Sequence, residues 1–466
     1  MDWNTIISRK RTGVNRDSAD IRTGFQRDYD RLIFSSAFRR LQNKTQVFPL
    51  PGSVFVHNRL THSLEVASVG RSLGKVVGQR LTDKGLIIGN DNQDFYKYEL
   101  QNVIAAACLA HDIGNPAFGH SGEKAISSYF DENHDYKIEG KKLSTLFATE
   151  EWKDLITFEG NANSFRTLTH TFNGKSEGGY LLSYITLASI LKYPCVSIAV
   201  KNSKEKKENE EKNICTKKYN FFEADKELAC AILDELNITK QCGSPLIYNR
   251  HPFVYLTEAA DDICYRIIDF EDAQRLSIIS QKDVEKLFTE LIKEIDRAEN
   301  DIDKVKKTLD SINDNNDRIG YLRAVCINSL TMESADIFMK NADNIIAGKY
   351  NNGLVDEIEK NSETLRNIKL ITDEEIYNHD SVVQLEITGY KVMNDLLSLF
   401  IPAILKKEPN HKDKKIRYLL PNQFKTNSND NYQKVLSVLD YVSGMTDLYA
   451  IELYRKLFGI DIPKHS

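Results

Sequence analysis

Four residues that could hold one metal ion are spread along the chain. They are His62, the adjacent pair His111 and Asp112, and Asp261. Each follows or interrupts an apolar stretch with helical spacing, which carries an imidazole or a carboxylate toward the protein interior. Buried polar groups of this kind require partners. Two imidazoles and two carboxylates would satisfy one another around one divalent cation, so we expect these four residues to be its ligands.

The donor atoms restrict the choice of metal. A mixed nitrogen and oxygen ligand set suits Mn, Fe, Co, Ni or Zn, and it suits Mg where substrate phosphates complete the coordination shell. A single buried histidine is more often a hydrogen-bonded core residue than a ligand. The adjacent His-Asp pair, placed between an Ala- and Leu-rich stretch and Gly114, favours the metal site over that interpretation.

A second histidine and carboxylate follow the His-Asp pair. His120 is surrounded by glycines and a proline, and Glu123 comes three residues later. If a helix begins near Gly119, His120 and Glu123 share one face of it. One of them could then protonate a leaving oxygen while the other orients water or the imidazole, beside the metal but not bound to it. The alternative is a pair at a helix start that satisfies local backbone groups.

The elements that must position these residues are predicted to be helices. Apolar residues recur three and four apart in four stretches, residues 60–73, 256–263, 283–309 and 382–405. Val196–Val200 is the best candidate for a strand, and ten prolines and 23 glycines are too few for a many-stranded sandwich. We expect a mostly α-helical fold, with a catalytic core in residues 1–275 and a helical C-terminal region in residues 276–466, without a clear linker between them.

Composition excludes several classes of protein. The 466 residues include 62 Lys and Arg against 67 Asp and Glu, and this net charge of −5 excludes nucleic-acid binding through bulk positive charge. The apolar run Val103–Ala110 is far shorter than the roughly 20 residues that a bilayer requires. Residues 1–13 contain no apolar segment typical of a signal peptide. Seven cysteines without a CxxC pair fit reduced thiols, so we expect a cytoplasmic protein with no membrane segment.

One segment, Lys201–Lys218, is too polar to be buried. It contains seven Lys and four Glu, a net charge of +3 (7 − 4). It cannot bury enough apolar surface to offset the entropy of ordering, so we expect a flexible insertion. Such a segment could contact phosphate or nucleic acid, but most charge runs simply face solvent.

These features resemble the HD superfamily of metal-dependent phosphohydrolases and, within it, the bacterial deoxyguanosine triphosphate triphosphohydrolase (dGTPase) family. His62, His111-Asp112 and Asp261 match the superfamily pattern. The blocks that resemble the dGTPase family are Ser35–Gln42, Lys44–Phe48, Arg59–Val66, His111–Pro116, Phe118–His120, Phe158–Ala162, Glu258–Tyr265 and Asp440–Asp447. The resemblance implies an HD-type helical core in residues 1–275. It also implies hydrolysis of a deoxynucleoside triphosphate, above all dGTP, to deoxynucleoside and tripolyphosphate, which would contribute to control of the dNTP pool.

The resemblance further implies roles for individual residues around the reacting phosphates. His120 would be the catalytic acid or base, and Glu123 would orient it. Arg59 matches a phosphate-contacting arginine, and Lys192 with Tyr193 matches a second phosphate-binding pair. Without the resemblance, Lys192 would be interpreted as a lysine that complements the dipole at a helix C-terminus.

Sugar and base contacts are implied in the same way. Tyr265 and Asp269 follow Asp261 by four and eight residues, so all three share one face of a helix. Tyr265 would pack under the deoxyribose, where a 2′-hydroxyl would clash, although a tyrosine four residues after a ligand is more often a core residue. The other candidate substrate contacts are Asp269 for the sugar hydroxyl, Gln46, Val47 and Asn161 for the nucleoside pocket, and Glu386 and Arg417 for the base region, the last two from a neighbouring subunit. Arg323 lies in a region where family members bind nucleotides or meet other subunits, with a solvent-facing helical arginine as the alternative.

The resemblance also implies a homo-oligomer, and three functions remain open. The first is a dGTP triphosphohydrolase, or a dNTP triphosphohydrolase of broader base range that needs a nucleotide activator. The second is an enzyme of another HD subclass, such as a 5′-nucleotidase or cyclic phosphodiesterase. The third is a regulatory protein that binds nucleotides or single-stranded DNA with little turnover. The complete set of four ligand candidates favours an enzyme over the third.

Overall fold

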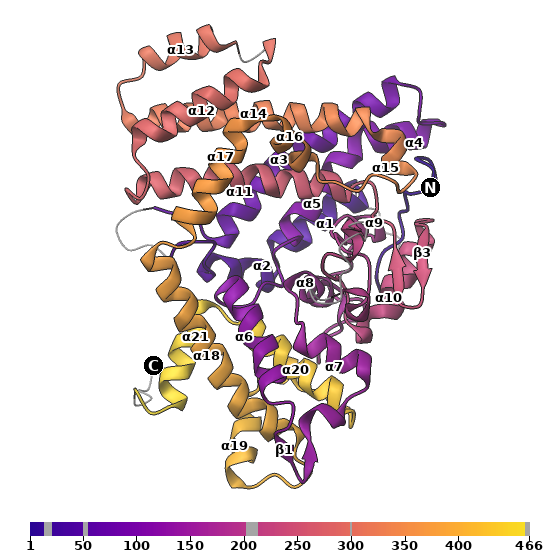
Figure 1. Cartoon of the computed structure of the whole chain (residues 1–466). Helices are drawn as coiled ribbons and strands as arrows, with labels where there is room; N and C mark the ends of the chain where they lie inside the picture. Colours follow the sequence, from indigo (N-terminus) through magenta and orange to yellow (C-terminus); the bar gives the residue numbers. More distant parts are fainter. Residues whose placement is uncertain (14–20, 50–54, 202–212, 299–300, 462–466) are drawn as a thin grey trace.

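The computed structural model describes residues 1–13, 21–49, 55–201, 213–298 and 301–461 (Figure 1). These residues form helices with two small antiparallel sheets of two strands each. In one sheet β1 (Lys137–Ile138) pairs with β2 (Lys141–Lys142), and in the other β3 (Lys240–Gly243) pairs with β4 (Leu246–Tyr248). The predicted mostly α-helical fold is confirmed. No helix in the described part of the chain combines the length and the apolar character needed to cross a membrane.

The first 275 residues supply eleven α-helices among the described residues. They are α1 (Gly24–Ile33), α2 (Ser36–Arg40), α3 (Arg59–Asp83), α4 (Asn90–Asp94), α5 (Leu100–Ala110), α6 (Gly119–Glu132), α7 (Thr149–Ile156), α8 (Gly160–Thr169), α9 (Tyr184–Ala188), α10 (Lys226–Glu235) and α11 (Val254–Arg275). The later helices are α12 (Gln281–Ile295), α13 (Ile302–Asp310), α14 (Asn315–Lys340), α15 (Ala342–Ile346), α16 (Leu354–Asn361), α17 (Glu363–Ile371), α18 (Asp380–Leu405), α19 (His411–Leu419), α20 (Asn431–Ser443) and α21 (Asp447–Leu457).

Helix α3 shows why this sequence forms a long buried helix. The side chain of Asn58 caps its first turn by accepting hydrogen bonds from the amides of Leu60 and Thr61. Buried residues then recur at helical spacing toward the core, whereas Leu64, inside the predicted apolar stretch, is 37% exposed. A side chain at Gly70 would meet Cys108 Sγ of α5 at 2.4 Å. The close approach of α3 and α5 therefore requires a glycine there.

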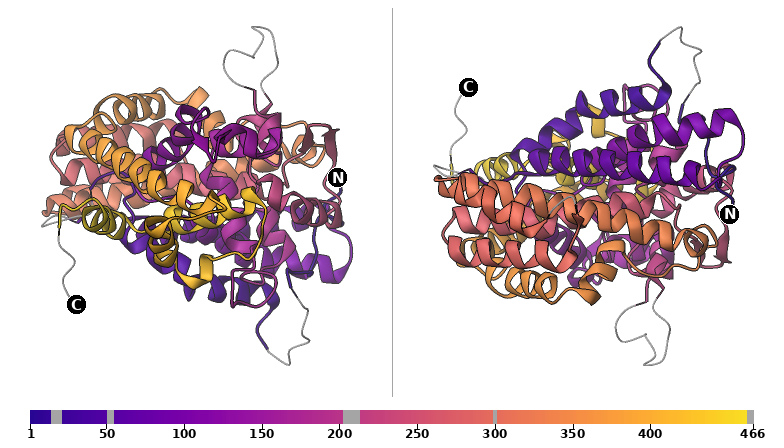
Figure 2. Two further views of the ribbon diagram at one scale, coloured as in Figure 1. Left: turned by 90° about the horizontal axis from the view of Figure 1, so that it is seen from below. Right: turned by 90° about the horizontal axis from the view of Figure 1, so that it is seen from above.

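Helices from both halves of the chain pack around the same centre. Helix α11 packs on α3, α5 and α14, and α18 packs on α6, α20 and α21. Figure 1 shows α12, α13 and α14 at one end of the molecule and α7, α19 and α20 at the other. In the right-hand view of Figure 2, the helices of residues 281–376 lie beside those of the first 110 residues. The residues after α11 thus pack against residues 1–275 on two sides, with α14 on α3 and α11 and with α18 on α6.

Two local expectations are corrected. Residues 196–200 do not form a strand, because Ser197–Ala199 forms a single 3₁₀ turn in which the Ala199 amide bonds back to Val196. Most of the Lys201–Lys218 segment, residues 202–212, lies outside the described residues. Its end is not a solvated loop: Ile214–Thr216 forms a 3₁₀ turn, and Cys215 is buried. The aliphatic and thiol side chains that interrupt the charges there give this part a buried face.

Candidate active site

A cavity of about 620 Å³ is lined by residues from α3, α6, α11 and α18. It gathers most of the predicted site residues, although they are up to 340 residues apart in sequence (386 − 46). The predicted residues that line it are Gln46, Val47, Arg59, His111, Asp112, His120, Glu123, Asn161, Lys192, Tyr193, Asp261, Tyr265 and Glu386. Of the remaining four, His62 and Asp269 lie directly behind the wall, bonded to residues that line it, and Arg323 and Arg417 lie elsewhere.

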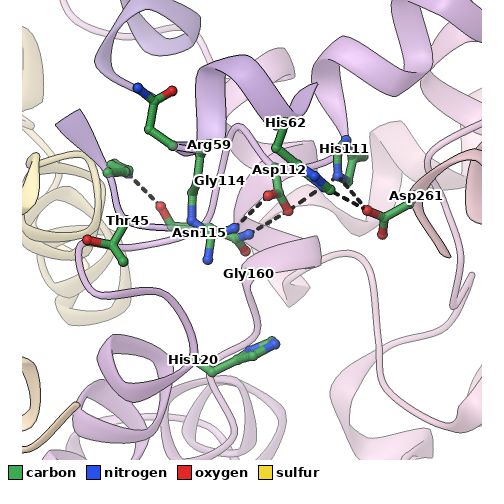
Figure 3. A network of polar contacts seen from close by, with 12 residues as sticks. Thr45, Arg59, His62, His111, Asp112, Gly114, Asn115, His120, Gly160 and Asp261 are labelled. Carbon is green, nitrogen blue, oxygen red and sulfur yellow. Dashed lines mark hydrogen bonds and ion pairs between the residues drawn. The ribbon is translucent and has the colours of Figure 1, made fainter. Parts of the chain in front are cut away.

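Three of the predicted metal ligands converge from three helices. His62 is in α3, His111 follows the last residue of α5, and Asp261 is in α11. One donor atom from each lies within 4.8 Å of the others. Asp261 Oδ1 is 3.0 Å from His62 Nε2 and 3.3 Å from His111 Nε2 (Figure 3). A group of two imidazoles and one carboxylate therefore exists in the folded chain.

The chemistry of this group fits a divalent cation. His111 Nδ1 donates to the carbonyl oxygen of Cys108 at 2.6 Å, so its Nε2 faces His62 and Asp261. Among the described residues, neither this buried Nε2 nor the buried Nδ1 of His62 has a hydrogen-bond partner. Burial lowers the pKa of His111, but the carboxylates of Asp112 and Asp261 outweigh this and raise it to about 9. The group thus favours positive charge at its centre and offers the nitrogen and oxygen donors that transition metals prefer.

Asp112, the predicted fourth ligand, lies beside this group. Its Oδ1 is 3.6 Å from His111 Nε2 and accepts a hydrogen bond from Asn115 Nδ2 at 2.6 Å. Its Oδ2 accepts from Arg59 Nη1 at 2.5 Å. Burial raises the pKa of Asp112, but the charges of Arg59 and His111 hold it below its ordinary value. Arg59 in turn lies against Gly119, where any side chain would meet Arg59 Nη2 at 2.6 Å.

The second histidine and carboxylate form a hydrogen-bonded pair. Helix α6 begins at Gly119, as predicted, and His120 Nδ1 is 2.7 Å from Glu123 Oε2. The other oxygen of Glu123 accepts from the amide of Gly160 at 2.8 Å. Burial raises the pKa of Glu123, but the hydrogen bond and charge of His120 outweigh this and hold it below its ordinary value. Figure 3 shows His120 apart from the His62, His111 and Asp261 group, so the cavity has two separate imidazole sites.

Two charged residues that were not assigned a role from the sequence line the cavity near this pair. Lys218 Nζ is 2.9 Å from Glu159 Oε1, and Glu159 also accepts from Asn161 Nδ2 at 2.7 Å. Burial raises the pKa of Glu159, and the nearby charge of Glu123 adds to this, while Lys218 opposes it. The four residues after Lys218 are buried and carry it toward the cavity, which the charged run that it ends does not indicate.

The predicted phosphate-binding pair is held by a buried ion-pair network. Lys192 Nζ is 3.1 Å from Glu258 Oε1, and Arg250 Nη1 donates to Glu258 Oε2 at 2.7 Å. Burial raises the pKa of Glu258, but Arg250 and Lys192 outweigh this and lower it to about 2. The Tyr193 ring lies within 5.9 Å of Lys192 Nζ. Glu258 thus holds both cations in place beside the cavity.

The sugar-binding prediction placed Tyr265 and Asp269 on one face of a helix, and both belong to α11. The Tyr265 side chain lines the cavity, with its ring centroid 5.7 Å from that of Tyr377, a further lining residue that carried no sequence signal. Asp269 is buried and accepts a hydrogen bond from the Tyr377 hydroxyl at 3.1 Å. Burial raises the pKa of Asp269 to about 7.

Two predicted residues lie away from the cavity in this chain. Arg323 donates to Glu271 Oε2 at 2.7 Å, at the contact between α14 and α11. Arg417 donates to backbone carbonyls at the end of α18, including Ala403 at 2.7 Å, and lines a separate surface groove. By contrast, Glu386 is at the cavity, and its carbonyl oxygen accepts from Ser121 Oγ at 3.1 Å. Residues from α18 therefore reach the site within a single chain.

Comparison with known proteins agrees with this geometry. Residues 59–178 match the HD domain, and residues 356–456 match the phosphohydrolase-associated domain. The chain is 36% identical over 465 residues to a deoxyguanosinetriphosphate triphosphohydrolase-like protein of Synechocystis sp., covering 99% of this chain and 100% of the relative. A protein of the same name from Pseudomonas aeruginosa is 35% identical over 474 residues, covering 99% and 100%. A deoxyguanosinetriphosphate triphosphohydrolase of Yersinia enterocolitica is 29% identical over 506 residues, covering 96% and 95%. The chain therefore belongs to the dGTPase family of HD-domain phosphohydrolases.

Proposed function

We propose that the chain hydrolyses a deoxynucleoside triphosphate, with dGTP as the principal substrate, at its α-phosphorus. The products are the deoxynucleoside and tripolyphosphate. The observation that carries the proposal is the single cavity that presents a metal-binding group and a separate His120–Glu123 pair to the same space. Relatives of this chain that carry the dGTP triphosphohydrolase name support the choice of substrate.

His62, His111 and Asp261 would hold the divalent cation, and Asp112 would join them after release from Arg59. When bound, the cation supplies charge neutralisation at the phosphate oxygens and a lowered pKa for a coordinated water. His111 Nδ1 is fixed by the Cys108 carbonyl, so its ring does not turn away from the site. The two imidazoles and the carboxylates thus define one side of the reacting phosphorus.

Cationic side chains would bind the remaining phosphates. Arg59 lies between Asp112 and Gly119, and Lys192 and Lys218 lie on other parts of the cavity wall. Each is paired with a carboxylate in the folded chain, so each charge is already positioned before substrate arrives. Charge-assisted hydrogen bonds to phosphate oxygens are stronger than neutral ones, which suits a polyanionic substrate.

His120 would move the proton. Its Nδ1 is held by Glu123, so its Nε2 is the atom left to face the substrate. A protonated imidazole in this position gives its proton to the 5′-oxygen as the bond from that oxygen to the α-phosphorus breaks. Glu123 fixes the orientation of the ring. The leaving deoxynucleoside then departs with a neutral hydroxyl group.

The sugar and base would occupy the remaining wall. Tyr265 would close the space under the deoxyribose. Asp269 would bind the sugar hydroxyl either directly or by way of the Tyr377 hydroxyl, which donates to it. Gln46, Val47, Asn161 and Glu386 would line the nucleoside pocket. The buried Oε1 of Gln46 has no hydrogen-bond partner within the described residues, which suits a contact with the nucleoside.

A product assay tests the proposed function. The metal-loaded protein is incubated with each of the four dNTPs and with GTP, singly and in mixtures, and nucleoside, tripolyphosphate, pyrophosphate and orthophosphate are resolved. We expect deoxyguanosine and tripolyphosphate from dGTP alone. Turnover only in mixtures would replace this proposal with an activator-dependent enzyme of broader base range. Absence of tripolyphosphate under every condition, with metal bound, would favour a nucleotide-binding or single-strand-binding protein.

A further inference from the structure

The segment that leads into His120 has a demanding backbone conformation. Phe118 and Gly119 have φ angles of 61° and 57°, in the left-handed region. Such a conformation is uncommon for a bulky residue and persists only where surrounding contacts fix it. Helix α6 starts at Gly119, so the backbone of Phe118 decides where His120 points. Contacts from other segments of the chain hold the Phe118 backbone in this conformation.

The backbone amide of Phe118 donates to a carboxylate from the far end of the chain. Asp447 Oδ1 accepts this hydrogen bond at 2.8 Å, and its Oδ2 accepts from the amide of Thr45 at 2.7 Å. Asp447 is 3% exposed. Thr45 and Phe118 both line the cavity, and Thr45 directly precedes Gln46 and Val47. One buried carboxylate thus joins two separate cavity walls.

A purely local role at the helix start does not account for these contacts. Asp447 is the first residue of α21, where a carboxylate stabilises the helix dipole. The cap of α21, however, is made by Thr446, whose side chain accepts from the amide of Tyr449 at 3.2 Å. Both oxygens of Asp447 point away from its own helix, to Phe118 and Thr45. The carboxylate therefore acts between segments and not within α21.

Neighbouring contacts hold the same segment from other sides. Lys44 Nζ is buried and donates to the carbonyl oxygens of Asn115 at 2.5 Å and of Ser443 at 2.9 Å. The Phe118 ring lies against Gly389 of α18, where a Cβ atom would come within 2.5 Å of it. These contacts pack the segment tightly. We therefore expect that loss of the Asp447 hydrogen bond shifts the backbone of residues 115–120.

We propose that Asp447 is a positioning residue that sets His120 and the Thr45–Val47 wall relative to each other. This inference rests on the proposed function for its catalytic consequence, but the contacts themselves do not. Asp447 touches neither the metal-binding group nor the space in the cavity. It acts through two backbone amides, so its removal changes the placement of the acid and leaves the metal ligands in place.

Asp447→Asn is the test variant, because it keeps the size and replaces one acceptor by an NH₂ group that faces a backbone N–H. We expect kcat to fall about ten- to a hundredfold while metal stoichiometry is unchanged. In a His120→Asn background the same substitution should lower kcat by less than twofold, because a residue that acts through His120 has no effect once His120 is gone. An equal loss in both backgrounds, or no loss in the first, overturns the proposal.

A matched control and a second readout separate positioning from stability. Asp413 is also buried near a helix start and accepts a backbone amide, from Asn410 at 3.1 Å, but lies away from the cavity. Asp413→Asn should leave kcat unchanged. Hydrogen exchange followed by mass spectrometry should become at least tenfold faster for residues 44–48 and 115–121 in Asp447→Asn, with α11 unchanged. Unchanged exchange in these two segments overturns the proposal, and because exchange needs no turnover, it remains decisive if the proposed function fails.

Discussion

The two histidine-containing groups of the cavity are built in opposite ways. In the first, the imidazoles are the buried part: the side chains of His62 and His111 are 1% and 13% exposed, against 30% for Asp261. In the second, the carboxylate is buried: Glu123 is 9% exposed and His120 is 70% exposed. The first group comes from three helices, whereas the second comes from a single turn of α6.

This difference corresponds to two chemical tasks. A metal ligand must be held in one orientation from behind, as the Cys108 carbonyl holds His111. A proton donor must reach a substrate that enters and leaves, so its ring stays accessible while its orienting partner is fixed. The Gly160 amide fixes Glu123 in this way. The comparison predicts that variants of the first group lose metal binding together with turnover, whereas variants of the second group lose turnover alone.

Loss of the first group should abolish both metal binding and turnover. We expect His111→Ala to bind less than one metal ion per chain and to lose activity at least about a thousandfold, because the metal contributes several kcal/mol of transition-state stabilisation. Asp112→Ala should give the same double loss if Asp112 joins the ligands. Metal content by mass spectrometry, read beside kcat, checks both. If Asp112→Ala kept its full metal content, Asp112 would not be a metal ligand, and its role would be to hold Arg59.

Loss of the exposed imidazole should abolish turnover alone. His120→Asn removes the proton donor and should lower kcat by about a hundred- to ten-thousandfold, the usual contribution of general acid catalysis. Metal content and the Kd for dGTP should remain within about twofold of the wild-type values, since the hydrogen bond of His120 goes to Glu123 and not to a metal ligand. Calorimetry and single-turnover kinetics provide the two readouts. A wild-type rate would remove His120 from the mechanism.

Loss of the orienting charge should have an intermediate effect. Glu123→Gln keeps an acceptor for the Gly160 amide but removes the negative charge beside His120. We expect kcat to fall about tenfold, because the charge-assisted hydrogen bond that orients His120 becomes a weaker neutral one. Metal content and the midpoint of thermal unfolding are measured beside kcat, and both should stay at the wild-type values. A wild-type kcat would mean that Glu123 does not orient His120 for catalysis.

Loss of a phosphate-binding cation should have the smallest effect on kcat. Lys218→Met should raise KM about tenfold with little change in kcat or metal content, as expected for a contact made equally in the ground and transition states. The neighbouring Lys217 is exposed and serves as the matched control, since Lys217→Met should leave KM unchanged. Equal KM values for the two variants would remove Lys218 from the substrate site.

The sequence was sufficient to predict the features that depend on short spacings. Helix α6 begins at Gly119, as predicted. His120 and Glu123 are three residues apart, which places them on one face of that helix, and they are hydrogen-bonded there. Residues 382–405 form a helix as their apolar periodicity predicts. The convergence of His62, His111 and Asp261 was predicted from the chemistry of their side chains, and the helices bring them together.

Features that depend on packing between distant segments were not predictable in this way. Lys218 ends a charged run, and only the burial of the aromatic residues after it turns the side chain toward Glu159. Tyr377 reaches the cavity because the short helix before it, Thr372–Ile376, packs on α11, which no local pattern encodes. Arg417 donates hydrogen bonds to carbonyl oxygens at the end of α18, and the residues around Arg417 in the sequence do not indicate this contact.

The most direct test of the account is to locate the oxygen that water delivers. The metal-loaded protein hydrolyses dGTP in water enriched in oxygen-18, and both products are analysed by mass spectrometry. Attack of water at the α-phosphorus, with His120 protonating the 5′-oxygen, predicts one labelled oxygen in tripolyphosphate and none in deoxyguanosine. Label in deoxyguanosine, or release of pyrophosphate or orthophosphate in place of tripolyphosphate, would contradict it.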